Sequence, residues 1–110
     1  MSNRRFIPHR FAVQDEEEIV QYYEQTSSEQ VALGFINVLD HAFLQLSRYP
    51  QMGSPRPEYD LALDGIRSWS LKRFPHLIYY QIQDDHIGLW RILHLKRDIA
   101  QTMLPSQRSQ

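Results

Sequence analysis

The sequence of 110 residues contains no cysteine. Disulfide bonds, thiolate nucleophiles and zinc–thiolate sites are therefore excluded. No apolar run approaches the roughly 20 residues that a membrane-spanning helix needs. Residues 1–11 are basic but lack the apolar segment of a secretory signal. We therefore expect a cytoplasmic protein that does not associate with membranes.

Sequence motifs for cofactors are missing too. The five histidines form no i, i+4 pair and no H-E-x-x-H sequence, the arrangement that binds zinc on one face of a helix. There is no P-loop, no Rossmann glycine fingerprint and no G-x-S-x-G nucleophile motif. We expect neither a metal site nor any other cofactor.

Charge is ordinary in amount but unevenly divided along the chain. Residues 1–64 carry 5 Lys or Arg against 10 Asp or Glu, a net charge of −5, whereas residues 65–110 carry 7 against 3, a net charge of +4. A basic surface attracts an acidic protein or a phosphate backbone. Lys and Arg also protect sheet edges from aggregation, so both interpretations of the basic half stay open.

The chain begins with a predicted strand and helix. The strand covers residues 4–8 and ends at Pro8, which has no amide to donate. The helix covers residues 11–24, and the acidic run at 15–18 lies near the positive end of its dipole. We interpret this run as a solvated helix face, because consecutive helical residues point in different directions.

A second helix gives the strongest periodic signal of the sequence. Apolar residues at i, i+3, i+4 and i+7 spacing predict a helix over residues 28–49, ended by Pro50. Ser27 and Gln30 form the S-x-x-Q pattern of a capping box at its start. The short connection to the first helix predicts a helical hairpin, and residues 51–65 read as a surface loop.

Three strands are predicted in the second half of the chain. They cover residues 66–71, 77–83 and 86–95, and short turns make them an antiparallel meander. The last run has apolar side chains on both alternations, which is typical of a central strand.

The tail and the overall class follow. Residues 98–104 suit a helical turn or two, and residues 105–110 are polar and expected to be disordered. We therefore predict a single α+β domain over residues 1–110, in which an N-terminal strand and a two-helix hairpin pack on a small, mainly antiparallel β-sheet.

Arg91 is the first candidate for chemistry. Strand alternation puts it on the same face as Leu89 and Leu93. Because an unpaired buried charge is costly, Arg91 either pairs with a helix carboxylate such as Glu17 or Glu24 or opens onto a functional groove.

His94 ends the same strand, and alternation puts it on the opposite face with Trp90. Its imidazole has a suitable pKa for a general base, and a structural histidine at a strand end is the alternative.

Four cations flank the strand ends, and two aromatic residues lie near them in the sequence. Together they suit a groove for phosphate or an acidic peptide, with rings that stack on bases or on a partner. The aromatic residues also suit a role in closing the core. These residues are Lys72, Arg73, Lys96, Arg97, Trp69 and Phe74.

The order of elements and several local patterns resemble the RelE/ParE superfamily of toxins from type II toxin–antitoxin (plasmid stabilisation) systems. The similar segments are residues 6–22 (FIP, then Ala12, Asp15, Glu17, Ile19 and Tyr22), 50–58 (PQMG to RPE), 65–80 (GIRSW to KRFPHLIYY) and 92–99 (ILHLKRDI). The chain departs from the family pattern at Glu16, where leucine is usual, and at Leu95, where glycine is common. No tyrosine follows Tyr80, although the ribonuclease branch usually has one near the chain end.

The resemblance implies a toxin neutralised by a cognate antitoxin, and the pattern is closer to the ParE branch, whose members inhibit DNA gyrase without being enzymes. The RelE branch, which cleaves mRNA on the ribosome, is the alternative, and an inactive relative that only pairs with its antitoxin is a third. The residues expected to contact a partner are Trp69, Arg73, Arg91, His94 and Arg97. The catalytic set of a ribonuclease would be Lys72, Arg73, Arg91, His94 and Arg97.

Overall fold

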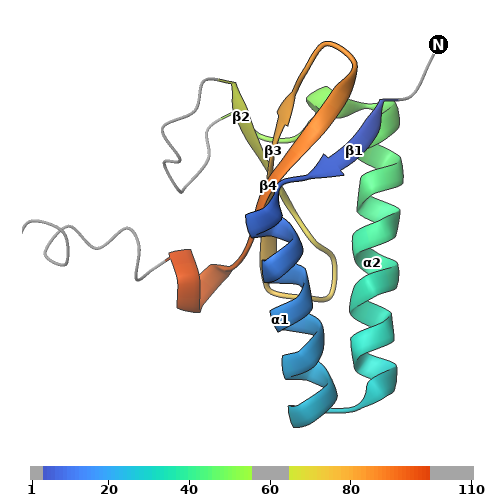
Figure 1. Ribbon diagram of the computed structural model, residues 1–110, viewed down its shortest axis with the longest axis vertical. Coiled ribbons are helices and arrows are strands. Elements are labelled where there is room, and N and C mark those ends of the chain that lie inside the picture. The colour runs from blue at the N-terminus through green and yellow to red at the C-terminus, as the bar shows by residue number, and fades with distance from the viewer. Residues whose placement is uncertain (1–3, 56–64, 100–110) are drawn as a thin grey trace, which may run out of the picture.

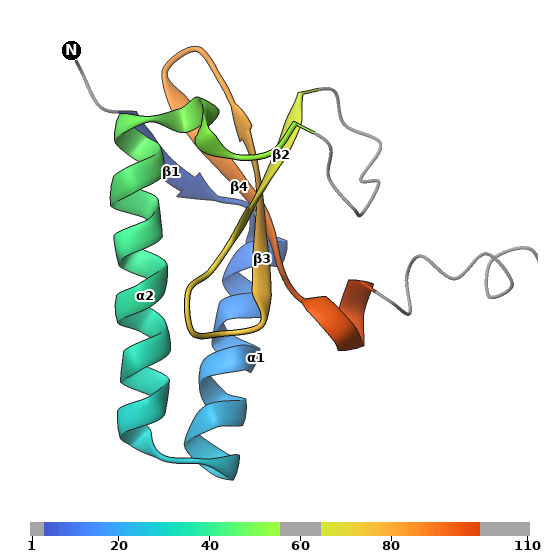
Figure 2. The same ribbon diagram turned by 180° about the vertical axis from the view of Figure 1, so that it is seen from behind.

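The computed structural model describes residues 4–55 and 65–99 as an α+β fold with two antiparallel helices and a four-stranded mixed sheet (Figures 1 and 2). The sheet order is β1-β4-β3-β2, with β1 parallel to β4 and the other neighbours antiparallel. The regular elements are β1 (Arg5–Pro8), α1 (Arg10–Thr26), α2 (Glu29–Arg48), β2 (Ile66–Ser70), β3 (His76–Ile82) and β4 (His86–His94).

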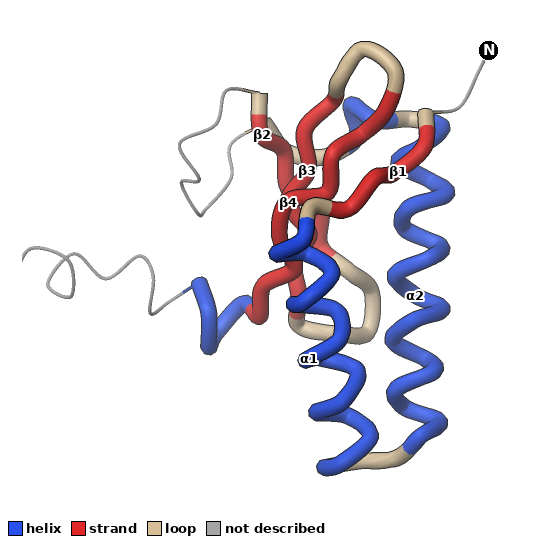
Figure 3. Tube along the Cα trace, in the orientation of Figure 1, coloured by secondary structure: helices blue, strands red, loops and turns tan. Residues whose placement is uncertain are grey.

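Two short turns complete the described chain (Figure 3). A 3₁₀ turn, Pro50–Met52, follows α2, and a π-helical turn, Leu95–Ile99, follows β4. None of the described helices has the length and apolar character needed to cross a membrane.

The predicted strands and helices are present, with ends within two residues of those expected, and β4 is an inner strand as predicted. The predicted cap of α2 was wrong by one residue. The side chain of Ser28 accepts the hydrogen bond from the Val31 amide at 3.1 Å, whereas Ser27 ends α1 by donating its backbone N–H to the Tyr23 carbonyl.

Parts of the loop and the tail lie outside the described residues. The 3₁₀ turn and a bridge between Ser54 and Ser68 occupy the start of the predicted loop. The helical turn after β4 begins earlier than expected, at Leu95. The predictions for residues 56–64 and 100–110, including a disordered 105–110, fall outside the described ranges.

The main core lies between the helical hairpin and one face of the sheet. The apolar stripe of α2 is buried there, together with Ala12 and Ile19 of α1. The sheet contributes alternate residues of β3 and apolar residues of β4, because side chains of a strand point to opposite faces in turn. The buried α2 and sheet residues are Ala32, Phe35, Leu39, Ala42, Leu46, Ile78, Tyr80, Ile87, Leu89 and Ile92.

A β-bulge interrupts the alternation of β4. Tyr80 pairs with Leu89 and Tyr79 pairs with Arg91, so Trp90 is an extra residue without a cross-strand partner. The prediction that Leu89, Arg91 and Leu93 share one face was therefore wrong: Leu89 belongs to the helix-side core, whereas Leu93 joins a second buried cluster. The bulge also breaks the expected alternation between Trp90 and His94.

Candidate functional site

The site begins where β1 stops and β4 continues. β1 pairs with β4 only as far as Leu89, whose carbonyl accepts a final bond from the His9 amide at 2.8 Å. The chain then turns into α1, so the next part of β4 has no strand on this side. α1 packs against it instead, which brings helix side chains to an open strand edge.

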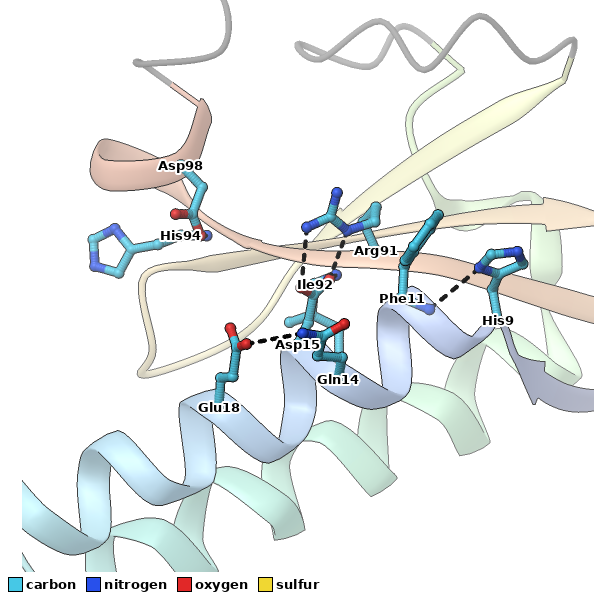
Figure 4. Close-up of polar contacts among 9 residues, drawn as sticks. All are labelled: His9, Phe11, Gln14, Asp15, Glu18, Arg91, Ile92, His94 and Asp98. Carbon is cyan, nitrogen blue, oxygen red and sulfur yellow. Dashed lines mark hydrogen bonds and ion pairs between the residues drawn. The ribbon is translucent and has the colours of Figure 1, made fainter.

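Asp15 supplies hydrogen-bond acceptors to that open edge of β4 (Figure 4). Its Oδ2 accepts the Ile92 backbone N–H at 3.0 Å, and the Arg91 guanidinium donates to Oδ2 at 2.8 Å and to Oδ1 at 3.0 Å. The bidentate geometry is the stronger form of an Arg–carboxylate pair. The side chains are largely shielded, with exposed fractions of 31% for Arg91 and 11% for Asp15, so this ion pair stabilises the junction between α1 and β4.

The bulge residue is held by aromatic neighbours. The Trp90 indole stacks on the His9 imidazole, with ring centroids 4.5 Å apart. His9 Nδ1 accepts the Phe11 backbone N–H at 3.2 Å and thereby caps α1. The Phe11 ring lies under the Arg91 guanidinium at 6.0 Å, within the range of a cation–π contact. The bulge therefore directs Arg91 towards the first turns of α1.

His94 ends β4 and caps the turn that follows. The ring atom Nδ1 of His94 accepts the backbone N–H groups of Lys96 and Arg97, each at 3.1 Å. The backbone N–H of His94 donates to Asp98 Oδ2 at 2.9 Å. Because Nδ1 acts as the acceptor, the imidazole proton belongs on Nε2. Burial and then the Arg97 charge lower the pKa of His94, so the neutral ring is favoured.

Asp98 completes this turn as the acidic partner of Arg97, whose Nε lies 3.2 Å from Asp98 Oδ1. Burial acts to raise the pKa of Asp98, but the His94 amide and the Arg97 guanidinium outweigh it and the net shift is downward. The Arg97 guanidinium also lies over the Tyr22 ring at 5.9 Å. The turn thus joins β4 to the outer face of α1.

A hollow of about 580 Å³ lies between α1, β4 and the turn, and His76 lines it from the inner side. His76 is buried, and its ring meets that of His94 edge-on at 5.2 Å. Burial, followed by the charges of His94 and Arg97, lowers the pKa of His76 to about 4. The hollow is lined by Asp15, Glu18, Ile19, Tyr22, Tyr23, His76, Arg91, Ile92, Leu93, His94, Arg97 and Asp98.

The sequence-predicted residues separate into two places. Arg91, His94 and Arg97 line the hollow beside α1. Lys72 and Arg73 line a different hollow, of about 300 Å³, against α2. The structure therefore does not bring the four expected cations into one groove.

The two aromatic candidates, Trp69 and Phe74, pack against the helix-side core and are partly buried.

Four residues of the site were missed or assigned to another role. Arg91 pairs with a helix carboxylate, as one interpretation expected, but the partner is Asp15 and not Glu17 or Glu24. Asp15 belongs to the acidic run that was interpreted as a solvated face, and for this residue that interpretation was wrong. Tyr22, His76 and Asp98 carry no sequence signal that distinguishes them from ordinary helix, core and turn residues. Within residues 4–55 and 65–99, no three His, Asp or Glu side chains gather in a way that could hold a metal ion.

Comparisons with known proteins agree with this architecture. The sequence model of the family described as "ParE toxin of type II toxin-antitoxin system, parDE" matches residues 7–99. A solved chain of the chromosomal ParDE TA system from P. aeruginosa has a similar fold, with a TM-score of 0.68 and 18% sequence identity, over 84% of this chain and 96% of that chain. No curated protein matches the sequence. Since the family match extends over most of its length, the chain belongs to the ParE toxin family of type II toxin–antitoxin systems.

Proposed function

We propose that the protein is a single-domain cytoplasmic toxin that a cognate antitoxin neutralises, and that it acts by binding and inhibiting DNA gyrase and not by catalysis. Membership of the ParE family supports the toxin role. The ParE-like sequence patterns favour gyrase over ribosomal mRNA as the target. Trp69, Arg73, Arg91, His94 and Arg97 are the residues proposed to contact a partner.

The observation that carries the non-catalytic mechanism is the hydrogen bonding of His94. A general base at Nε2 needs a lone pair on that atom, which requires the proton to move to Nδ1. Nδ1 already accepts two backbone N–H groups, from Lys96 and Arg97. Protonating Nδ1 would break both of these bonds, so His94 is better suited to a structural role and to contact through its Nε2–H.

The cations support the same conclusion. Arg91 and Arg97 are each paired with a carboxylate, Asp15 and Asp98 respectively. Phosphoryl transition states are stabilised by cations that converge on the developing charge, and Lys72 and Arg73 lie in a different hollow. Arg97 keeps an exposed fraction of 54%, which leaves it available for recognition of a protein surface.

The test compares the wild-type protein with His94→Asn. Asparagine is a good cap, because its side-chain oxygen accepts backbone N–H groups, but it has no imidazole. We expect the variant to stay folded and to keep inhibiting gyrase supercoiling, weakened by no more than the loss of the single contact through the His94 Nε2–H. Arg97→Ala should weaken inhibition several-fold.

The wild-type protein and His94→Asn are also incubated with translating ribosomes, and any cleavage sites in the mRNA are mapped. Ribosome-dependent cleavage by the wild type that His94→Asn abolishes would overturn the proposal in favour of a ribonuclease. Normal growth on expression without antitoxin, together with unchanged supercoiling, would identify an inactive relative.

A further inference from the structure

The helical hairpin carries a further groove, of about 570 Å³. It lies on a different face of α1 from the hollow that Arg91, His94 and Arg97 line. Its floor is apolar and its rim is acidic. Val13 has an exposed fraction of 40%, and Leu33, which precedes Ile36 by three residues on the same face of α2, has 53%. The floor residues are Val13, Val20 and Ile36, and the rim residues are Glu16, Glu17, Gln21 and Glu24.

The rim carboxylates form no ion pair with a cation of the described residues. The ion pairs formed within residues 4–55 and 65–99 involve Asp15, Asp85 and Asp98, and none involves Glu16, Glu17 or Glu24. Asp40 of α2 adds a further negative charge beside Glu16. These like charges repel one another, and no ion pair of the described residues offsets that repulsion.

The pKa of Glu16 responds to this repulsion. Burial, and then the charges of Asp40 and Glu17, raise the pKa of Glu16 above its ordinary value. A cation brought to the rim would favour the ionised form and so oppose this upward shift of the Glu16 pKa. The groove is thus electrostatically complementary to a basic surface.

We propose that this groove binds a basic amphipathic helix of a partner protein, with apolar side chains on Val13, Val20 and Ile36 and Lys or Arg side chains on the acidic rim. The groove is formed by two helices, so it offers no open strand edge to an extended peptide. A bound segment must therefore satisfy its own backbone hydrogen bonds, as a helix does. This inference does not depend on the target of the toxin.

The experiment uses the full chain and two synthetic probes. One probe is a helical peptide with leucines at i, i+3, i+4 and i+7 spacing and lysines on its polar face, and the other has glutamates in place of the lysines. Binding is measured by calorimetry at two salt concentrations, and backbone amide NMR shifts locate the contact. We expect the basic peptide to bind and to shift the resonances of α1 and α2 around the groove. Its affinity should fall as the salt concentration rises.

Matched variants decide whether the groove is responsible. Glu16→Gln/Glu24→Gln removes two charges from the rim, and Asp84→Asn/Asp85→Asn removes two from the exposed β3–β4 turn. The rim variant should weaken binding of the basic peptide by about tenfold or more, and the turn variant should leave it unchanged. Thermal melts verify that both variants fold, which is expected because neutralising Glu16 removes repulsion.

Three outcomes would overturn the proposal. Equal losses in both variants would mean a non-specific response to net charge. Equal binding of the two peptides would mean that the acidic rim plays no part. Assembly of the protein alone into dimers that the rim variant dissociates would assign the groove to a second copy of the chain.

Discussion

Asp15 uses both carboxylate oxygens to join the first helix to the last strand. It accepts from a backbone amide and from a guanidinium at the point where β4 extends beyond β1. A strand edge that is otherwise unpaired must find such an acceptor, since a shielded N–H without a partner is costly. One side chain thus takes the place of a missing strand and fixes the direction of Arg91.

Asp15→Ala should therefore be strongly destabilising. It leaves the Arg91 guanidinium and the Ile92 amide without their shared acceptor, at a cost of about 2–3 kcal/mol. The free energy of unfolding is measured with urea. The matched control is Asp85→Ala, which removes a solvent-exposed partner of His86 and should leave stability unchanged. Equal effects of the two substitutions would contradict the role assigned to Asp15.

His76 should make stability depend on pH. Its pKa is about 4 in the folded protein and 6.5 in its ordinary state, so the unfolded chain binds the proton more tightly. Stability should be unaffected by this group above pH 6.5 and should fall as the pH drops from 6.5 towards 4. The loss near pH 4.5 is on the order of 2 kcal/mol.

Substitution His76→Phe isolates that contribution. The ring lies among Tyr23, Phe35 and His94, and within the described residues its Nδ1 has no hydrogen-bond partner, so phenylalanine suits the position. Urea unfolding at pH 7 and near pH 4.5 should show a smaller loss for the variant than for the wild type. An identical pH dependence would assign the effect to the neighbouring carboxylates.

At the scale of elements, what the sequence could reveal depended on periodicity. The stripe of α2 and the meander were predictable because each repeats a pattern over many residues. The bulge at Trp90 was not, because one inserted residue leaves apolar side chains on both alternations of β4. The bulge determines the direction in which Arg91 points, so the sequence alone could not identify Asp15 as its partner. The candidate site was therefore predicted only in part.

The start of α2 offers a test at this scale. Ser28→Ala removes the side-chain acceptor of the Val31 amide and should lower the free energy of unfolding by about 1 kcal/mol. Ser27→Ala should have a much smaller effect, because Ser27 caps α1 through its backbone N–H only. Chemical denaturation of the two variants side by side gives the answer, and a larger effect at Ser27 would mean that the capping box of the sequence pattern is the true cap.

At the scale of the molecule, the N-terminal strand β1 joins β4 at the edge of the sheet and packs against α2. Phe6 stacks on Phe43 of α2 with ring centroids 4.7 Å apart and lies 6.0 Å from the Tyr80 ring. Phe6→Ala should cost about 2 kcal/mol, whereas Ile7→Ala, at an exposed side chain of the same strand, should cost less. Because β1 joins a strand far along the chain, we expect Phe6→Ala to speed unfolding and to change refolding little. Stopped-flow measurements test this, and slower refolding with unchanged unfolding would contradict it.

The parallel pairing of β1 with β4 also has a consequence for synthesis. Arg5 lies opposite His86 and Pro8 opposite Leu89, so the first strand to leave the ribosome is paired only after nearly all of the others have been made. Contacts of such separation slow folding, and until they form the apolar face of the hairpin is open to chaperones and proteases. A chain whose translation stalls before β4 is therefore expected to be degraded, so that only fully translated copies accumulate.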